Sequence, residues 1–106
     1  MNTEFDVGME FSKFPSEVVE KMLNGYLNGT EIRVLLFIVH QMYKEKNPDA
    51  FVMIPKSKFM KSLHVPSDRL FNCIRKLRSD GIVEVREGKS GTNEYKAFHK
   101  WCKVCR

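Results

Sequence analysis

The side chains best suited to chemistry in this sequence are the basic and amide groups between Ser67 and Ser79. Arg69 and Asn72 lie one helical turn apart near the start of this segment. Arginine can make two hydrogen bonds to the edge of guanine, and asparagine can make two to the edge of adenine. With Leu70, Ile74 and Leu77 facing inward, the outward residues of this helix are expected to be Ser67, Asp68, Arg69, Asn72, Arg75, Lys76 and Ser79.

Two flanking segments carry groups that suit a phosphate. The first opens a short helical pattern, where backbone N–H groups, a hydroxyl and two ammonium groups come together at Lys56, Ser57 and Lys58. The second surrounds Gly88 and Gly91, since glycines let a backbone approach a phosphate or a narrow groove closely. Its candidate contacts are Arg86, Lys89, Ser90, Thr92, Asn93 and Lys96. An ordinary capped helix and a flexible hairpin tip are the alternatives for these two segments.

Phe71 sits at the boundary of the exposed face of the 67–79 helix. It can meet a thymine methyl group or widen the hydrophobic core. Because aromatic residues in helices are mostly buried, we expect Phe71 in the core. If it is exposed, it favours a protein partner, since an aromatic beside Arg75 is typical of a protein hot spot.

Other chemistries find little support. Gly88-Lys89-Ser90 is similar to the end of a phosphate-binding loop, but the earlier glycine is replaced by Val83, and two strands flank the segment. His99, Cys102 and Cys105 have metal-ligand spacing without an evident fourth ligand. No nucleophile, zinc-protease or paired-carboxylate motif appears. We therefore predict no enzyme, no cofactor and no metal site.

The 106 residues predict one domain, residues 1–106, with 1–10 and 100–106 as candidate flexible tails. Helical spacing starts after Pro15 and ends near Asn24 or Asn28, and a second, largely apolar helix follows with Thr30 as its expected cap. Packing of the two helices should bury Val19, Leu23, Leu35 and Ile38.

Residues 50–54 form a short β-like run before Pro55. Ser57 and Ser67 are the expected caps of two further helices, joined by a tight turn at residues 64–66. Residues 82–86 and 94–99 read as the two strands of a hairpin whose facing stays ambiguous. This order predicts a mainly α fold with a small β-hairpin, the winged helix-turn-helix.

The residues Phe11–Val18 and Leu27–Ile38 resemble the N-terminal domain of bacteriophage replication protein O and related phage replication initiators. The resemblance follows the element order over residues 10–88. It implies a winged helix that binds origin DNA, while a separate C-terminal portion of those proteins helps to load the helicase.

The chain departs from that family in two places. Residues 42–46 lack the expected Tyr-Gly-Trp, and the sequence ends soon after the predicted wing. We therefore expect DNA binding without helicase loading. An isolated DNA-binding domain and a small mobile-element protein that reuses the fold are both compatible with this, and so is a transcriptional regulator.

The charge distribution agrees with a polyanionic partner. Residues 1–28 hold two lysines against five acidic residues, whereas residues 29–106 hold sixteen basic against eight acidic residues. The expected partner is double-stranded DNA, with a protein partner as the alternative and a homodimer left open. Three cysteines, an acidic N-terminus and no long apolar run predict a cytoplasmic protein that does not enter a membrane.

Overall fold

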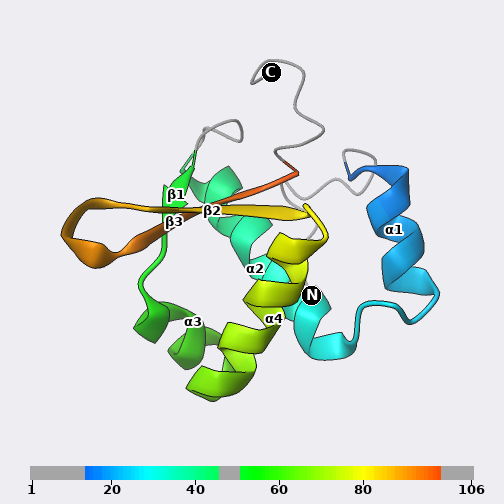
Figure 1. Ribbon diagram of the computed structural model, residues 1–106, viewed down its shortest axis with the longest axis horizontal. Coiled ribbons are helices and arrows are strands. Elements are labelled where there is room, and N and C mark those ends of the chain that lie inside the picture. Colours follow the sequence, from blue (N-terminus) through cyan, green and yellow to red (C-terminus); the bar gives the residue numbers. More distant parts are fainter. Residues whose placement is uncertain (1–13, 46–50, 99–106) are drawn as a thin grey trace.

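A computed structural model describes residues 14–45 and 51–98 (Figure 1). Within these residues the chain is mainly helical, with one small antiparallel sheet, and the predicted winged helix-turn-helix is confirmed. The elements are α1 Ser16–Leu23, α2 Gly29–Lys44, β1 Val52–Met53, α3 Lys56–Leu63, α4 Ser67–Ser79, β2 Val83–Glu87 and β3 Asn93–Ala97, with a 3₁₀ turn at Lys89–Gly91.

The central helix α2 begins with a reciprocal cap. Asn28 Oδ1 accepts a hydrogen bond from the Glu31 backbone at 2.8 Å, and the Asn28 backbone donates to Glu31 Oε1 at 2.9 Å. Each bond satisfies a backbone N–H that has no partner inside the helix. The expected cap at Thr30 is therefore wrong, because Thr30 already lies within the first turn.

The helices α3 and α4 form the helix-turn-helix. Their N-caps are Pro55 and Pro66, so the expected caps at Ser57 and Ser67 are wrong, and neither helix start has a side-chain cap. Proline fixes an extended entry into the helix and has no N–H of its own to satisfy. His64, with a left-handed φ of 54°, ends α3, and the turn then buries Val65.

The wing is the hairpin β2–β3, and β1 extends it to a three-stranded sheet in the order β1-β3-β2. Val85 and Val52 pair with Tyr95 from either side, and Val83 pairs with Ala97. Because alternate residues of a strand face opposite sides, this register turns Val83, Val85, Tyr95 and Ala97 toward the helices. The alternate residues, Glu84, Arg86, Glu94 and Lys96, face the other side.

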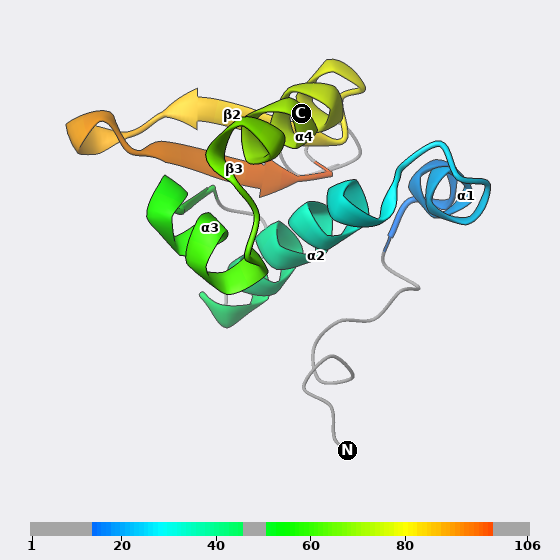
Figure 2. The same ribbon diagram turned by 90° about the horizontal axis from the view of Figure 1, so that it is seen from below.

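The hydrophobic core lies between α2, α3, α4 and the sheet (Figure 2). The predicted burial of Leu35 and Ile38 is confirmed. The predicted burial of Leu23 is wrong, since 81% of it is exposed, and Val19 is only partly buried. The short helix α1 lies at the end of the molecule away from the wing, where it buries Val18 (Figures 1 and 2).

No helix among the described residues combines the length and apolar character needed to cross a membrane. The candidate tails, residues 1–10 and 100–106, lie outside the described residues.

Candidate nucleic-acid interface

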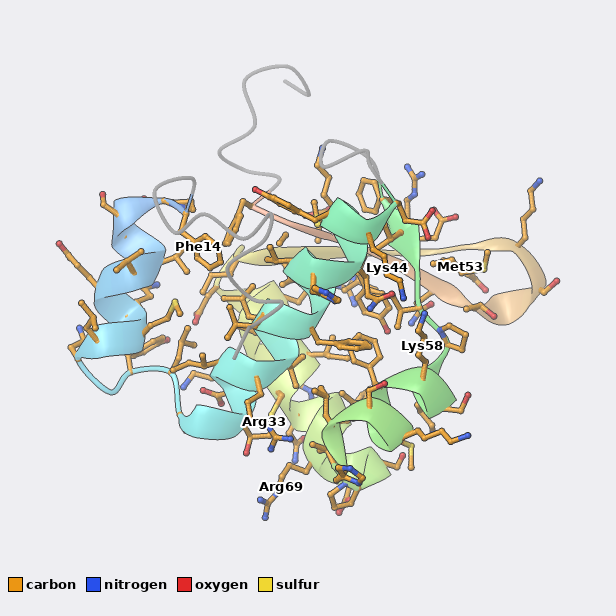
Figure 3. The ribbon with its side chains drawn as sticks, turned by 180° about the vertical axis from the view of Figure 1, so that it is seen from behind. Phe14, Arg33, Lys44, Met53, Lys58 and Arg69 are labelled. Carbon is orange, nitrogen blue, oxygen red and sulfur yellow. The ribbon has the colours of Figure 1, made fainter. Side chains whose placement is uncertain are left out.

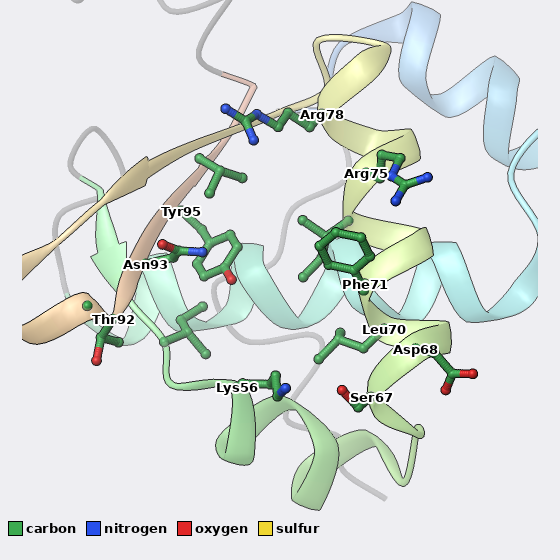
Figure 4. Close-up of a pocket in the computed structure, with 14 residues that line it drawn as sticks. Lys56, Ser67, Asp68, Leu70, Phe71, Arg75, Arg78, Thr92, Asn93 and Tyr95 are labelled. Carbon is green, nitrogen blue, oxygen red and sulfur yellow. The ribbon is translucent and has the colours of Figure 1, made fainter.

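A groove of roughly 950 Å³ runs between α4 and the wing and reaches the first residue of α3 (Figure 4). It combines residues of the helix-turn-helix with residues of the hairpin, so the tertiary fold alone creates it. Its lining residues are Ile54, Lys56, Ser67, Asp68, Leu70, Phe71, Ile74, Arg75, Arg78, Val85, Gly91, Thr92, Asn93 and Tyr95.

The floor of the groove is apolar and rigidly supported. Tyr95 packs edge-on against Phe59 of α3 at 5.2 Å between ring centroids, and Phe59 packs against Phe37 of α2 at 5.3 Å. Burial raises the pKa of the Tyr95 phenol, and a side-chain hydrogen bond with Asn93 acts in the opposite direction. The ring contacts of Tyr95 therefore fix the wing to the helices through β3, the central strand of the sheet.

The rim of the groove is basic. Lys56, Arg75 and Arg78 line it together with a single carboxylate, that of Asp68. Among the described residues, no carboxylate makes an ion pair with these three basic side chains. The groove therefore presents positive charge to solvent over an apolar surface.

Phe71 is the main departure from expectation in this groove. The prediction that it lies in the core is wrong, because 61% of its surface is exposed. Leu70, Cys73 and Leu77 already fill the space between α4 and its neighbours. Phe71 instead points toward the wing side, where the Arg75 guanidinium lies 4.9 Å from its ring centroid (Figure 4).

Five of the fourteen predicted contact residues line this groove: Lys56, Ser67, Arg75, Thr92 and Asn93. Six others are exposed outside it: Ser57, Lys58, Arg69, Asn72, Lys89 and Ser90. Figure 3 shows Lys58 on α3 and Arg69 extending away from the fold.

The remaining three predicted contacts are engaged elsewhere. Lys76 Nζ donates to the Tyr26 carbonyl at 2.8 Å and lies 3.3 Å from Glu31 Oε1, so it ties α4 to the start of α2. These contacts draw Lys76 toward α2 and the loop that precedes it, and it does not line the groove, so its contact with DNA stays a prediction.

Arg86 and Lys96 belong to the face of the sheet that points away from the helices. Arg86 Nε lies 2.7 Å from Glu94 Oε1, and its guanidinium covers the Phe51 ring at 4.0 Å. Lys96 is only 2% exposed. The strand register turns both away from the groove, so their predicted phosphate contacts would lie on the other face of the wing and stay predictions.

The site residues that the sequence prediction missed are Arg78 and the exposed Phe71. The signal was available, since Phe71, Arg75 and Arg78 recur at helical spacing and form one stripe along α4. The prediction assigned Phe71 to the core and did not include Arg78 among the contact residues.

The wing tip depends on a close backbone approach. A Cβ at Gly88 would lie 2.5 Å from the Thr92 carbonyl oxygen and 2.9 Å from Glu94 Cγ. The Gly88 backbone donates to this same Thr92 oxygen at 2.9 Å. The tip then turns through Ser90 and Gly91, both with positive φ.

The candidate metal ligands His99, Cys102 and Cys105 lie outside the described residues. No group of three potential metal ligands occurs within the part of the chain that the structure describes. Cys73 is buried, and its burial, together with the nearby Glu31 carboxylate, raises the pKa of its thiol.

Comparison with known proteins adds no identification: no protein-family model, no curated protein and no solved structure matches this chain.

Proposed function

We propose that this protein binds double-stranded DNA, with α4 in the major groove and the wing beside the flanking backbone. The observation that carries the proposal is the groove between α4 and the wing, whose basic rim of Lys56, Arg75 and Arg78 has no ion-paired carboxylate among the described residues. In winged and unwinged helix-turn-helix proteins the second helix lies in the major groove. This is the element from which Arg75 and Arg78 project.

The proposal divides the basic residues into two roles. Arg69 and Asn72, near the start of α4, would contact base edges. Lys56 at the start of α3, Lys89 at the wing tip, and Arg75 and Arg78 further along α4 would contact phosphates. All of these side chains are exposed, and Lys56, Arg75 and Arg78 line the groove.

The test is a salt titration of affinity for mixed-sequence duplex DNA, measured by fluorescence anisotropy. Each phosphate contact releases counterions and contributes about 0.9 to the slope of log affinity against log salt. Arg75→Ala combined with Arg78→Ala should weaken binding at low salt and flatten this slope by up to about 1.8. Affinity that stays unchanged in this double variant would contradict the proposal.

Arg86→Ala is the matched control. It removes the same type of side chain from the opposite face of the wing, where Arg86 already pairs with Glu94. It should leave both the affinity and the salt slope close to those of the native protein. A loss equal to that of the groove variant would mean that the wing binds DNA through its other face.

The biological setting remains part of the proposal. The resemblance to phage replication initiators favours a role in phage or mobile-element replication, and transcription control suits the same residues. We expect this activity in the cytoplasm, which for a viral protein is that of the host cell.

A protein-interaction module is the second candidate, and the exposure of Phe71 beside Arg75 is the observation that favours it. We rank it second because the surrounding face is not neutral. Arg69, Arg75 and Arg78 outnumber the single acidic residue Asp68 on α4. A native protein with no affinity for any duplex at low salt would make this the better proposal, as a homodimer or a complex with another protein.

A further inference from the structure

We propose that Phe71 recognises the 5-methyl group of pyrimidines in the major groove, so that the protein prefers thymine and 5-methylcytosine to their unmethylated counterparts. This inference rests on the proposed DNA-binding function and adds a specificity-determining residue to it. It starts from the exposed position of Phe71.

The placement of Phe71 suits a contact with base edges. It lies in the second turn of α4, on the side that faces the groove, with 61% of its surface exposed. Neighbouring groove residues Leu70, Ile74 and Tyr95 continue the apolar surface beneath it. Phe71 and these groove residues together form an apolar surface that a partner can cover.

The charge around Phe71 indicates what kind of partner covers it. Lys56, Arg75 and Arg78 line the same groove, so an incoming surface should combine negative charge with a small apolar group. Duplex DNA has this combination in the major groove, where phosphates border the base edges. The apolar group that it presents there is the pyrimidine 5-methyl group of thymine, which contacts apolar side chains including phenylalanine.

Arg75 holds the ring in place. Its guanidinium lies 4.9 Å from the centroid of the Phe71 ring, one helical turn further along α4. A planar guanidinium stacks on an aromatic face more effectively than an ammonium group does. We therefore assign Arg75 as a positioning residue for Phe71, in addition to its own charge.

The test uses two pairs of duplexes that differ only in the methyl group. One pair is alternating A·T against alternating A·U, and the other is alternating 5-methylcytosine·G against alternating C·G, all of equal length. Both pairs vary the same methyl group, on A·T and on C·G base pairs respectively, and the Phe71 variants separate a direct contact from an effect of the methyl group on duplex shape. Affinities are measured by fluorescence anisotropy at one low salt concentration.

The native protein should bind the methylated member of each pair about fourfold more tightly per methyl group in contact, the ratio expected for burying one such group. Phe71→Ala should abolish this preference, and Phe71→Leu should keep part of it. Arg75→Lys should keep the salt slope and reduce the methyl preference. Because Phe71 is exposed, these variants should fold, and circular dichroism with thermal unfolding checks that they do.

The possible failures are distinguishable. If the native protein binds every duplex but ignores the methyl group, the role of Phe71 is wrong and the DNA-binding proposal stands. The same holds if Phe71→Ala discriminates as well as the native protein. If the native protein binds none of the four duplexes, the proposed function itself fails, this inference fails with it, and the groove is reassigned to a protein partner.

Discussion

The two faces of the wing make different contacts, although their residues alternate along the same two strands. The inner face, with Val85 and Tyr95, packs on the helices and opens into the groove beside α4. On the outer face, Arg86 pairs with Glu94, and Lys96 is buried. Being basic does not by itself make a wing residue a DNA contact, because the strand register decides on which face of the sheet the residue lies.

The largest expected effect comes from removing the support of the inner face. Phe59 is fully buried between Phe37 and Tyr95, so Phe59→Ala should lower the free energy of unfolding by about 3–5 kcal/mol. Phe71→Ala is the control, since the same substitution at an exposed site should change stability by less than about 0.5 kcal/mol. Urea denaturation measures both, and equal losses would mean that Phe71 is also part of the core.

A change at the wing tip should disturb both faces together. In Gly88→Ala the new methyl group would lie 2.5 Å from the Thr92 carbonyl oxygen and 2.9 Å from Glu94 Cγ, so the hairpin must shift. We expect a loss of about 1–3 kcal/mol by thermal or urea unfolding. Gly29→Ala is the control, because no atom lies within 4 Å of a Cβ there. A neutral Gly88→Ala would show that the tip does not depend on this close approach.

The ion pair on the outer face should contribute less. A double-mutant cycle with Arg86→Ala and Glu94→Ala should give a coupling energy of about 0.2–1 kcal/mol, because the arginine side chain is 60% exposed. The cycle is needed since Arg86→Ala alone also removes the contact with Phe51. The coupling should shrink as salt is added. A coupling that is large and independent of salt would contradict the view of a solvent-screened pair.

The smallest expected effect is a loss of folding stability through ionisation of Tyr95, which occurs only in alkali and not at neutral pH. Burial raises the pKa of Tyr95 above its ordinary value of 10.0, so the unfolded chain loses this proton at a lower pH than the folded protein. Stability from this group is complete below about pH 10 and is lost as the pH rises through the folded-state pKa.

Tyr95→Phe tests this directly, because it removes the titrating group and keeps the ring. Its free energy of unfolding should fall less steeply above about pH 10 than that of the native protein. Part of the decline should remain in the variant, since the pKa of the buried Cys73 thiol is also raised. Identical pH profiles would mean that Tyr95 titrates as freely in the folded state as in the unfolded chain.

Some of this architecture could be predicted because its causes are local in the sequence. The apolar spacing in α2 and α4, the break at Asp80-Gly81 and the glycines of the wing tip act within a few residues of one another. They predicted the order of the elements, the turn between α3 and α4, and the burial of Leu35 and Leu70. The predicted cap positions were wrong by one or two residues. Asn28 caps α2 instead of Thr30, and Pro66 caps α4 instead of Ser67.

The sequence by itself determined the helices, the hairpin and the concentration of positive charge after residue 28, because periodicity and composition are properties of neighbouring residues. Only the tertiary structure decided which of these charges is exposed in the groove. Lys76 is drawn to Glu31 and Tyr26 across the fold, and the pairing of β2 with β3 turns Arg86 and Lys96 outward. Phe71 stays exposed because Leu70, Cys73 and Leu77 fill the space beneath α4. This depends on how closely the neighbouring elements approach α4.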